Sequence, residues 1–222
     1  MTADGRLSEA LTWLDAHADP AVRDQMGPRY GIHTDQALGV AMKDMKVLAK
    51  ELGRDHGLAA ALWSTGGYEA RTVAALIDEP ARVDGDQMDR WAGDFDNWAI
   101  CDTVCFNLFD RTTGAWTKVD QWAVDGREFV TRASFALIWA LALHDKAVTG
   151  AQLARDLDVA EAGAADDRPL VSKSVIMAMR AIGKKHPQMA PAVRETAQRL
   201  AASGDRARAR VGRAVVKELP PG

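Results

Sequence analysis

The sequence has few of the features that mark secreted, membrane-bound or disulfide-rich proteins. Only two of its 222 residues are cysteines, and the spacing of Cys101 and Cys105 suits neither a CxxC zinc motif nor a disulfide framework. No apolar run of about 18 residues occurs, as a membrane-spanning helix would require. The N-terminus lacks the basic and apolar segments of a signal peptide. We therefore expect a cytoplasmic protein with reduced cysteines and no contact with membranes.

Motifs for metals, cofactors and covalent catalysis are also missing. The five histidines lie in different segments and never four residues apart, so no metal site is predicted. The sequence contains no phosphate-binding loop, no dinucleotide-binding glycine motif and no nucleophile elbow, so no cofactor is predicted either. Strands are not expected, because no segment alternates apolar and polar residues with β-branched enrichment.

What the sequence does contain is helical periodicity along most of its length. The chain is 47% hydrophobic and 27% charged, which is typical of one globular domain that folds without disulfides. Successive helix pairs span about 35–45 residues and show no heptads, as in HEAT or armadillo repeats. We predict an all-α, HEAT-like solenoid over residues 1–222, in which residues 1–24 form an N-terminal helical cap. An irregular helical bundle is the structural alternative.

The expected helices follow the apolar spacing. They cover residues 7–14, the first part of 20–38, 40–52, 56–63, 68–77, 86–109 with a break at 94–96, 115–124, 128–144, 149–159, 170–183, 190–203 and 205–219. Asp4 or Ser8 is expected to cap the first helix, and residues 161–168 to form a loop. In the helix 40–52, Val47 is expected to face the core.

Aromatic and acidic residues gather in the stretch 87–109. If this stretch is helical, Trp98 and Asp102 lie on one face because they are four residues apart. An indole face and a carboxylate side by side suit a cationic sugar or base. A core tryptophan beside a surface aspartate would give the same spacing. Trp63 and Trp91 are expected in the core.

Basic residues are concentrated in two parts of the chain, although the net charge is −3. Lys43 and Lys46 begin a basic stripe on one predicted helix. The last third adds Lys173, Arg180, Lys184, Lys185, Arg206, Arg208, Arg210, Arg213 and Lys217. These residues are expected to line one concave strip that binds a phosphate backbone, or else to be a solvated surface.

Two arginines lie in apolar surroundings and need partners. Arg132 is in an apolar helix, where its charge must be paired or must line a cleft. Arg71 is expected to form an ion pair with Glu69 or another nearby acid.

Five ordered blocks of the sequence resemble the DNA alkylation repair family typified by the AlkD glycosylases. They are YGIHTDQALGVAMKDMKVLAKELG (30–53), ALWSTGGYEARTVAALI (61–77), MDRWAGDFDNWAICD (88–102), REFVTRASFAL (127–137) and KSVIMAMRAIGKKHP (173–187). The resemblance runs over roughly residues 25–218. It implies a stack of HEAT-like helix pairs that cradles duplex DNA. It also implies hydrolysis of the N-glycosidic bond of cationic N3- and N7-alkylpurines without base flipping.

The resemblance also implies roles for single residues. Trp98 matches the tryptophan that packs against the lesion's deoxyribose, and Asp102 matches the aspartate that stabilises the cationic sugar and helps to position water. Arg132 matches the arginine that contacts the DNA backbone beside the lesion. The expected partner is double-stranded DNA, alkylated or branched, bound by a monomer.

One position departs from the family pattern. Met177 stands where active members have a second tryptophan, and a thioether contacts a sugar without offering a π surface. Two alternatives to a glycosylase therefore stay open. One is a non-catalytic binder of branched or distorted DNA on the same fold. The other is a helical-repeat scaffold for a protein partner.

Overall fold

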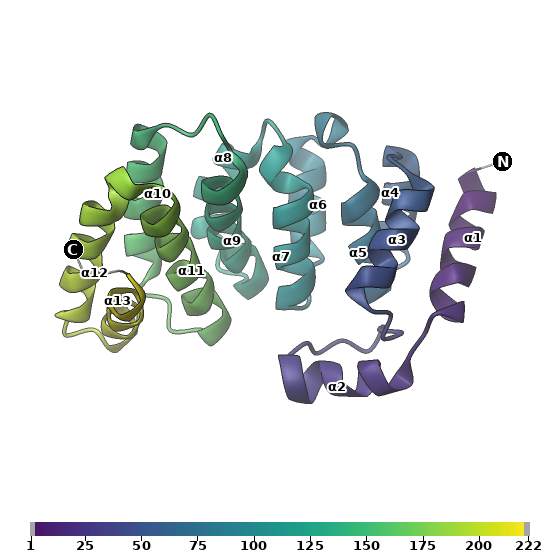
Figure 1. Cartoon of the computed structure of the whole chain (residues 1–222), viewed down its shortest axis with the longest axis horizontal. Helices are drawn as coiled ribbons and strands as arrows, with labels where there is room; N and C mark the ends of the chain where they lie inside the picture. Colours follow the sequence, from purple (N-terminus) through teal and green to yellow (C-terminus); the bar gives the residue numbers. More distant parts are fainter. Residues whose placement is uncertain (1–2, 220–222) are drawn as a thin grey trace. The chain divides into compact units, whose positions relative to one another are not determined.

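The computed structural model describes residues 3–219 and is all-helical over that range. These residues form 13 α-helices and three short 3-10 helices, and none of them lies in a β-strand (Figure 1). The contacts divide the chain into two compact units, with the boundary between Thr113 and Gly114. Within the described residues, no helix is both long enough and apolar enough to cross a membrane.

Unit 1 carries the first seven α-helices. They are α1 (Ala3–Ala16), α2 (Pro20–Tyr30), α3 (Met42–Leu52), α4 (His56–Ser64), α5 (Tyr68–Ile77), α6 (Gly85–Gly93) and α7 (Trp98–Asn107), with 3-10 helices at Pro80–Arg82 and Phe109–Arg111. Helix α5 packs against α3, α4 and α7. In Figure 1, α3, α5 and α7 lie side by side, and α2 runs crosswise to them.

Short polar side chains start most helices of unit 1. The residues whose side chains accept first-turn N–H groups are Asp19, Asp55, Asp84 and Asn97. Helix α3 ends at Gly53, whose φ of 71° suits glycine. The prediction that Asp4 or Ser8 caps the first helix is wrong, because α1 begins at Ala3 and both residues lie inside it. The position that precedes α1 falls outside the described residues.

A single buried carboxylate holds the segment between α2 and α3. Glu69 on α5 is 1% exposed and accepts backbone N–H groups of Leu38 at 3.0 Å, Gly39 at 2.8 Å and Val40 at 3.3 Å. Gly39 has a φ of 86°, and a Cβ there would lie 2.2 Å from the Asp19 carbonyl oxygen. The segment is therefore fixed both to α5 and to the start of α2.

The sequence suggested Glu69 as one possible partner of Arg71, but the Glu69 carboxylate binds the segment between α2 and α3 instead. The Arg71 guanidinium instead donates to the Asp94 carbonyl at 3.0 Å, lies 3.8 Å from the Asp94 carboxylate and covers the Trp63 ring at 5.0 Å. The alternative of another nearby acid is thus confirmed. Trp63 and Trp91 are core residues as expected: both are buried, and their rings stack at 4.0 Å.

Unit 2 carries the remaining six α-helices. They are α8 (Ala115–Ala123), α9 (Glu128–His144), α10 (Gly150–Gly163), α11 (Pro169–Lys185), α12 (Ala190–Ala201) and α13 (Arg206–Glu218), with a 3-10 helix at Pro187–Met189. Helices α9 and α11 make the most extensive contact in the molecule. The apolar side chains of α9 from Ala133 to Leu137 are fully buried, which agrees with a central helix.

Two sequence expectations fail at helix boundaries and faces. The loop predicted for residues 161–168 is shorter, because α10 continues to Gly163, where a Cβ would lie 2.2 Å from the Phe135 ring. Val47 is 50% exposed, since it lies two residues from the buried Met45 and so on the opposite side of α3.

An acid is buried in unit 2 without full hydrogen bonding. Asp156 on α10 is 1% exposed, and its Oδ2 has no hydrogen-bond partner among residues 3–219. Burial raises the pKa of Asp156 to about 7, an effect that Arg155 opposes and Asp120 reinforces.

Helices α12 and α13 approach each other very closely at Gly212. A Cβ at that position would lie 2.2 Å from the Ala201 backbone nitrogen and 2.5 Å from the Ala197 carbonyl oxygen. Only glycine permits this approach. It fixes the short connection at residues 202–205.

Candidate nucleic-acid interface

Trp98 and Asp102 occupy one partly exposed face of α7, as their spacing predicted. The Asn97 carboxamide oxygen starts the helix by accepting the N–H groups of Ala99 and Ile100, both at 3.0 Å. Ala99, Ile100 and Val104 are buried, whereas Trp98 and Asp102 are only half-buried. The indole and the carboxylate are thus accessible from one side.

The orientation of Trp98 is fixed from α2. Its indole N–H donates to the backbone carbonyl of Tyr30 at 3.0 Å, and Tyr30 is the last residue of α2. The Tyr30 ring is half-exposed, with the Arg29 guanidinium 5.2 Å from its centre. A hydrogen bond of this kind holds the indole plane in one direction.

The two cysteines pack behind this face and are not reactive groups. Cys101 and Cys105 are fully buried and are not joined in a disulfide. Burial, together with the neighbouring Cys101, raises the pKa of the Cys105 thiol well above its ordinary value. This agrees with the packing role expected from the sequence.

Arg132 is buried between two helices of unit 2. Only 3% of it is exposed, and its guanidinium donates to the Leu170 carbonyl in the first turn of α11 at 2.5 Å. Its own carbonyl accepts the Ser174 hydroxyl at 3.1 Å. Arg132 therefore links α9 to α11, and contact with a DNA backbone stays a prediction.

The predicted basic residues of α11 fall on one face of that helix. Lys173, Met177, Arg180 and Lys184 are spaced by four, three and four residues, which is the repeat of a helix face. Lys173 and Lys184 are exposed and Met177 is half-buried. We call this row the α11 stripe. Lys185 is also exposed, one residue outside the row.

Arg180 is less available than the lysines of the α11 stripe. Its guanidinium pairs with Glu218 on α13 and lies 3.3 Å from the Met177 sulfur. The side chain is 25% exposed. Its positive charge is thus partly offset by a carboxylate of the same unit.

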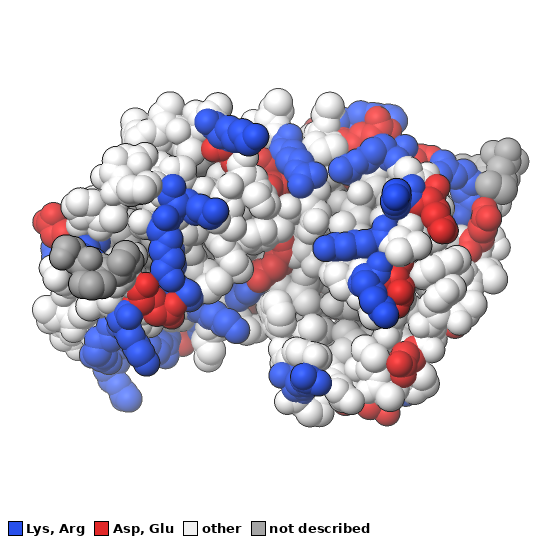
Figure 2. All heavy atoms as spheres, viewed as in Figure 1, with Lys and Arg blue, Asp and Glu red and all other residues white. Residues whose placement is uncertain are grey.

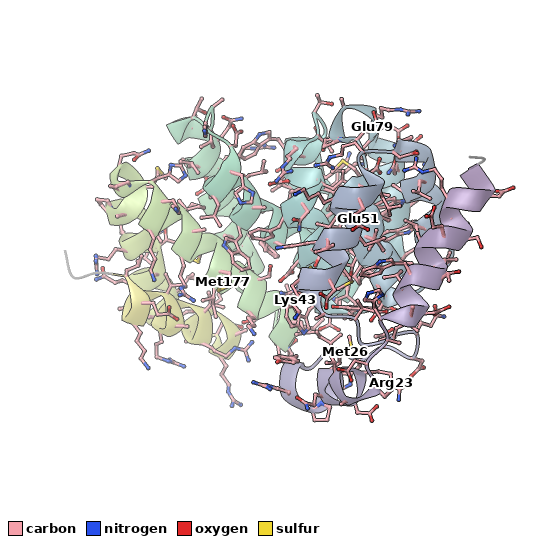
Figure 3. All side chains as sticks on the ribbon, turned by 45° about the vertical axis from the view of Figure 1, so that its right-hand side comes forward. Arg23, Met26, Lys43, Glu51, Glu79 and Met177 are labelled. Carbon is pink, nitrogen blue, oxygen red and sulfur yellow. The ribbon has the colours of Figure 1, made fainter. Side chains whose placement is uncertain are left out.

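Unit 1 has its own basic surface on α3. Lys43, Lys46 and Lys50 are exposed and share one side of the helix. Figure 2 shows basic side chains over this part of the unit, and Figure 3 labels Lys43 on α3 and Met177 on α11. Lys46, Lys50 and Arg54 border a hollow of about 320 Å³, which places three cationic side chains around it.

The structure brings some predicted residues together and adds others. Trp98 and Asp102 share a face of α7, and the residues of the α11 stripe share a face of α11. The Tyr30 carbonyl was not predicted, because a backbone group 68 residues away leaves no side-chain signal. A convergence of Arg206, Arg210 and Arg213 on one recess was not predicted either.

Comparison with known proteins gives a family and a fold. A family model described as "DNA alkylation repair enzyme" matches residues 10–204, whereas the blocks in the sequence predicted a resemblance over roughly residues 25–218. A solved structure is similar with a TM-score of 0.77 and 20% sequence identity, over 86% of this chain and 82% of that chain. It is described as "a new family of proteins related to the HEAT-like repeat DNA glycosylases with affinity for branched DNA structures". The predicted HEAT-like fold is therefore confirmed. No curated protein sequence matches.

Proposed function

The chain belongs to the DNA alkylation repair enzyme family, and on that basis we propose that it binds duplex DNA and hydrolyses the N-glycosidic bond of cationic N3- and N7-alkylpurines. The observation that carries the proposal is the pairing of Trp98 and Asp102 on one accessible face of α7. The proposal includes a monomer that works in the cytoplasm, where the buried thiols of Cys101 and Cys105 stay reduced.

The chemistry requires stabilisation of positive charge on the sugar. The bond between C1′ and the base nitrogen breaks, and its electron pair neutralises the cationic base, which leaves without needing a proton. Water adds to C1′ and gives up a proton. The Asp102 carboxylate stabilises the developing cation and orients the water, and the Trp98 face packs on the deoxyribose.

The basic side chains supply affinity in this proposal. Lys43 and Lys46 on α3, and Lys173, Lys184 and Lys185 on α11, bind phosphates of the backbone without reading the base sequence. Arg132, held against α11, contacts the backbone beside the lesion. Base identity is then selected by the positive charge of the alkylated purine, which makes it a good leaving group.

A second candidate function is favoured by Met177. Without a second aromatic surface, the protein would bind branched or distorted DNA and leave the glycosidic bond intact. The structurally similar family described as having affinity for branched DNA supports this alternative.

The deciding experiment is release of 7-methylguanine and 3-methyladenine from methylated duplex DNA. Wild type is compared with Asp102→Asn, and with Asp86→Asn as a control for loss of an exposed carboxylate on α6. We expect Asp102→Asn to lower excision about 10²-fold or more, to keep its DNA affinity, and Asp86→Asn to behave as wild type. If the wild type releases no base but binds branched DNA, the second candidate replaces the first.

A further inference from the structure

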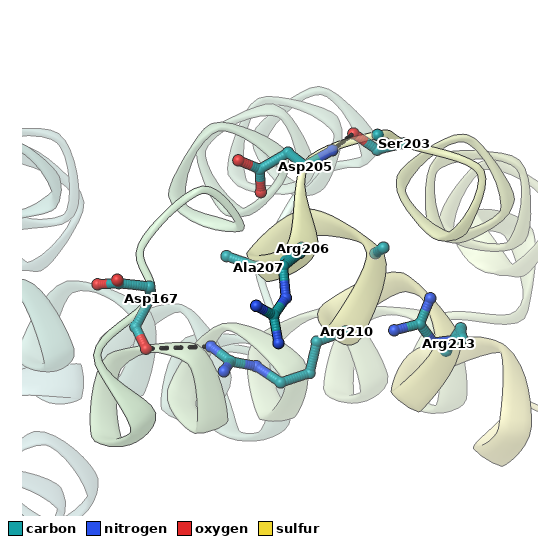
Figure 4. A pocket seen from close by; sticks show the side chains of 9 residues that line it. Asp167, Ser203, Asp205, Arg206, Ala207, Arg210 and Arg213 are labelled. Atoms are coloured by element: carbon teal, nitrogen blue, oxygen red, sulfur yellow. Dashed lines mark hydrogen bonds between the residues drawn. The ribbon is translucent and has the colours of Figure 1, made fainter.

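Three arginines of α13 converge on a recess of about 620 Å³ at the connection between α12 and α13 (Figure 4). Arg206, Arg210 and Arg213 are four and three residues apart, so the helix places them on one side. Asp167, ahead of α11, and Asp205, ahead of α13, also line the recess. We call this site the arginine recess.

The three guanidinium groups differ in how they are held. Arg210 donates to the Asp167 carbonyl at 3.2 Å and to the hydroxyl of the buried Ser172 at 3.1 Å. Arg206 and Arg213 are exposed and have neither a hydrogen-bond nor an ion-pair partner for their guanidinium groups among residues 3–219. Three cations around one hollow repel each other, and a bound anion removes that repulsion.

The chemistry of the wall favours one compact anion. Guanidinium groups bind phosphate through paired N–H donors. The carboxylates of Asp167 and Asp205 would repel further phosphates placed beside the first, so the recess does not suit a run of backbone phosphates. Its volume is in the range of small-ligand sites, about 300–1,000 Å³, and leaves space for a nucleoside next to the phosphate.

We propose that the arginine recess binds a phosphate monoester carried by a nucleotide, and that in DNA this is the phosphate at the end of a strand. A monoester has about −1.5 to −2 charges and three free oxygens, which matches three arginines better than an internal diester does. The assignment of this phosphate to the end of a DNA strand rests on the proposed function.

Within unit 2, the recess lies near the arginine that is proposed to contact the backbone beside the lesion. Arg132 bonds to the Leu170 carbonyl and Arg210 bonds to the Ser172 hydroxyl, so both hold the first turn of α11. The recess therefore lies at the same end of α11 as the residue proposed to contact the backbone beside the lesion. Strand ends arise there when a damaged strand is cut.

The first test uses free adenosine 5′-monophosphate, with adenosine as the comparison, in calorimetric titrations. Arg206→Gln/Arg213→Gln removes two charges and leaves Arg210 bonded. Arg90→Gln/Lys146→Gln removes two other exposed charges and serves as the matched control. We expect the monophosphate to bind wild type and the control, adenosine not to bind, and the recess variant to lose at least tenfold in affinity. Equal binding by wild type and recess variant, or no binding by either, overturns the proposal.

The second test uses nicked duplexes that differ only in a 5′-phosphate or a 5′-hydroxyl at the nick. Wild type should bind the phosphorylated nick at least fivefold more tightly, and the recess variant should show no preference. Absence of a preference in wild type overturns the assignment to strand ends. Binding of the monophosphate without any DNA binding would refute the proposed function and leave the phosphate site standing. DNA binding without monophosphate binding would refute the phosphate site and leave the proposed DNA binding standing.

Discussion

Removing two lysines of the α11 stripe should change the salt dependence of DNA binding by a calculable amount. Lys173 and Lys184 are exposed on one face of α11. Their eleven-residue separation in the sequence corresponds to about 16 Å along the helix at roughly 1.5 Å per residue. Phosphates of one strand follow each other every 3.4 Å or so along the duplex axis. The two lysines therefore contact different phosphates.

Each lost phosphate contact lowers the slope of log K against log salt concentration by about 0.9. Lys173→Gln/Lys184→Gln should therefore reduce the slope by about 1.8. Between about 50 and 200 mM salt, wild type would lose about tenfold more affinity than the variant. Fluorescence anisotropy with one labelled, undamaged duplex at several KCl concentrations measures this directly.

The control is again Arg90→Gln/Lys146→Gln, which removes the same charge from two exposed positions outside the stripe. Its slope should equal that of wild type. A stripe variant with an unchanged slope would refute the assignment of α11 to the DNA backbone. Equal changes in both variants would mean that only net charge matters and that no defined surface binds the duplex.

Three further predictions concern single side chains. Met177→Trp should speed base excision about tenfold in single-turnover assays by adding a π surface on the α11 stripe; an unchanged rate would mean that residue 177 does not touch the sugar. Asp156→Asn should flatten the pH dependence of stability. Because burial raises the pKa of Asp156 from 3.8 to about 7, the native state binds more protons than the unfolded state in that window, and wild type should lose up to about 4 kcal/mol as pH rises through it. Urea unfolding at about pH 5 and 8 tests this, and equal pH dependence in both proteins would count against it. Glu69→Ala should lower the free energy of unfolding by about 3 kcal/mol, because three backbone donors lose their acceptor; a smaller loss would show that water replaces the carboxylate.

Most of the helical framework could be predicted from periodicity. The helices at Tyr68–Ile77 and Glu128–His144 begin and end at the predicted residues, because apolar spacing and flanking turn residues agree there. The end of α10 was missed, because Glu161, Ala162 and Gly163 show no apolar periodicity, whereas in the structure Gly163 packs directly against the Phe135 ring. Tertiary packing decided that boundary.

The candidate site was predictable where it depends on spacing within one helix. Four residues between Trp98 and Asp102 suffice to place both on one face of α7. The expected pair of Arg71 and Glu69 failed for the same kind of reason, because residues two apart on a helix do not face each other. The Tyr30 carbonyl depends on long-range folding, so no local pattern indicated it.

The hydrogen bond from Trp98 to Tyr30 has a consequence for substitutions outside α7. The indole is positioned by α2, and α2 is held in turn by the Glu69 carboxylate through the segment at residues 38–40. Substitutions in that segment can therefore re-aim the indole while every residue of α7 stays the same. In the proposed function, the direction of the indole is therefore set in part by α2 and its connection, outside the helix that carries Trp98 and Asp102.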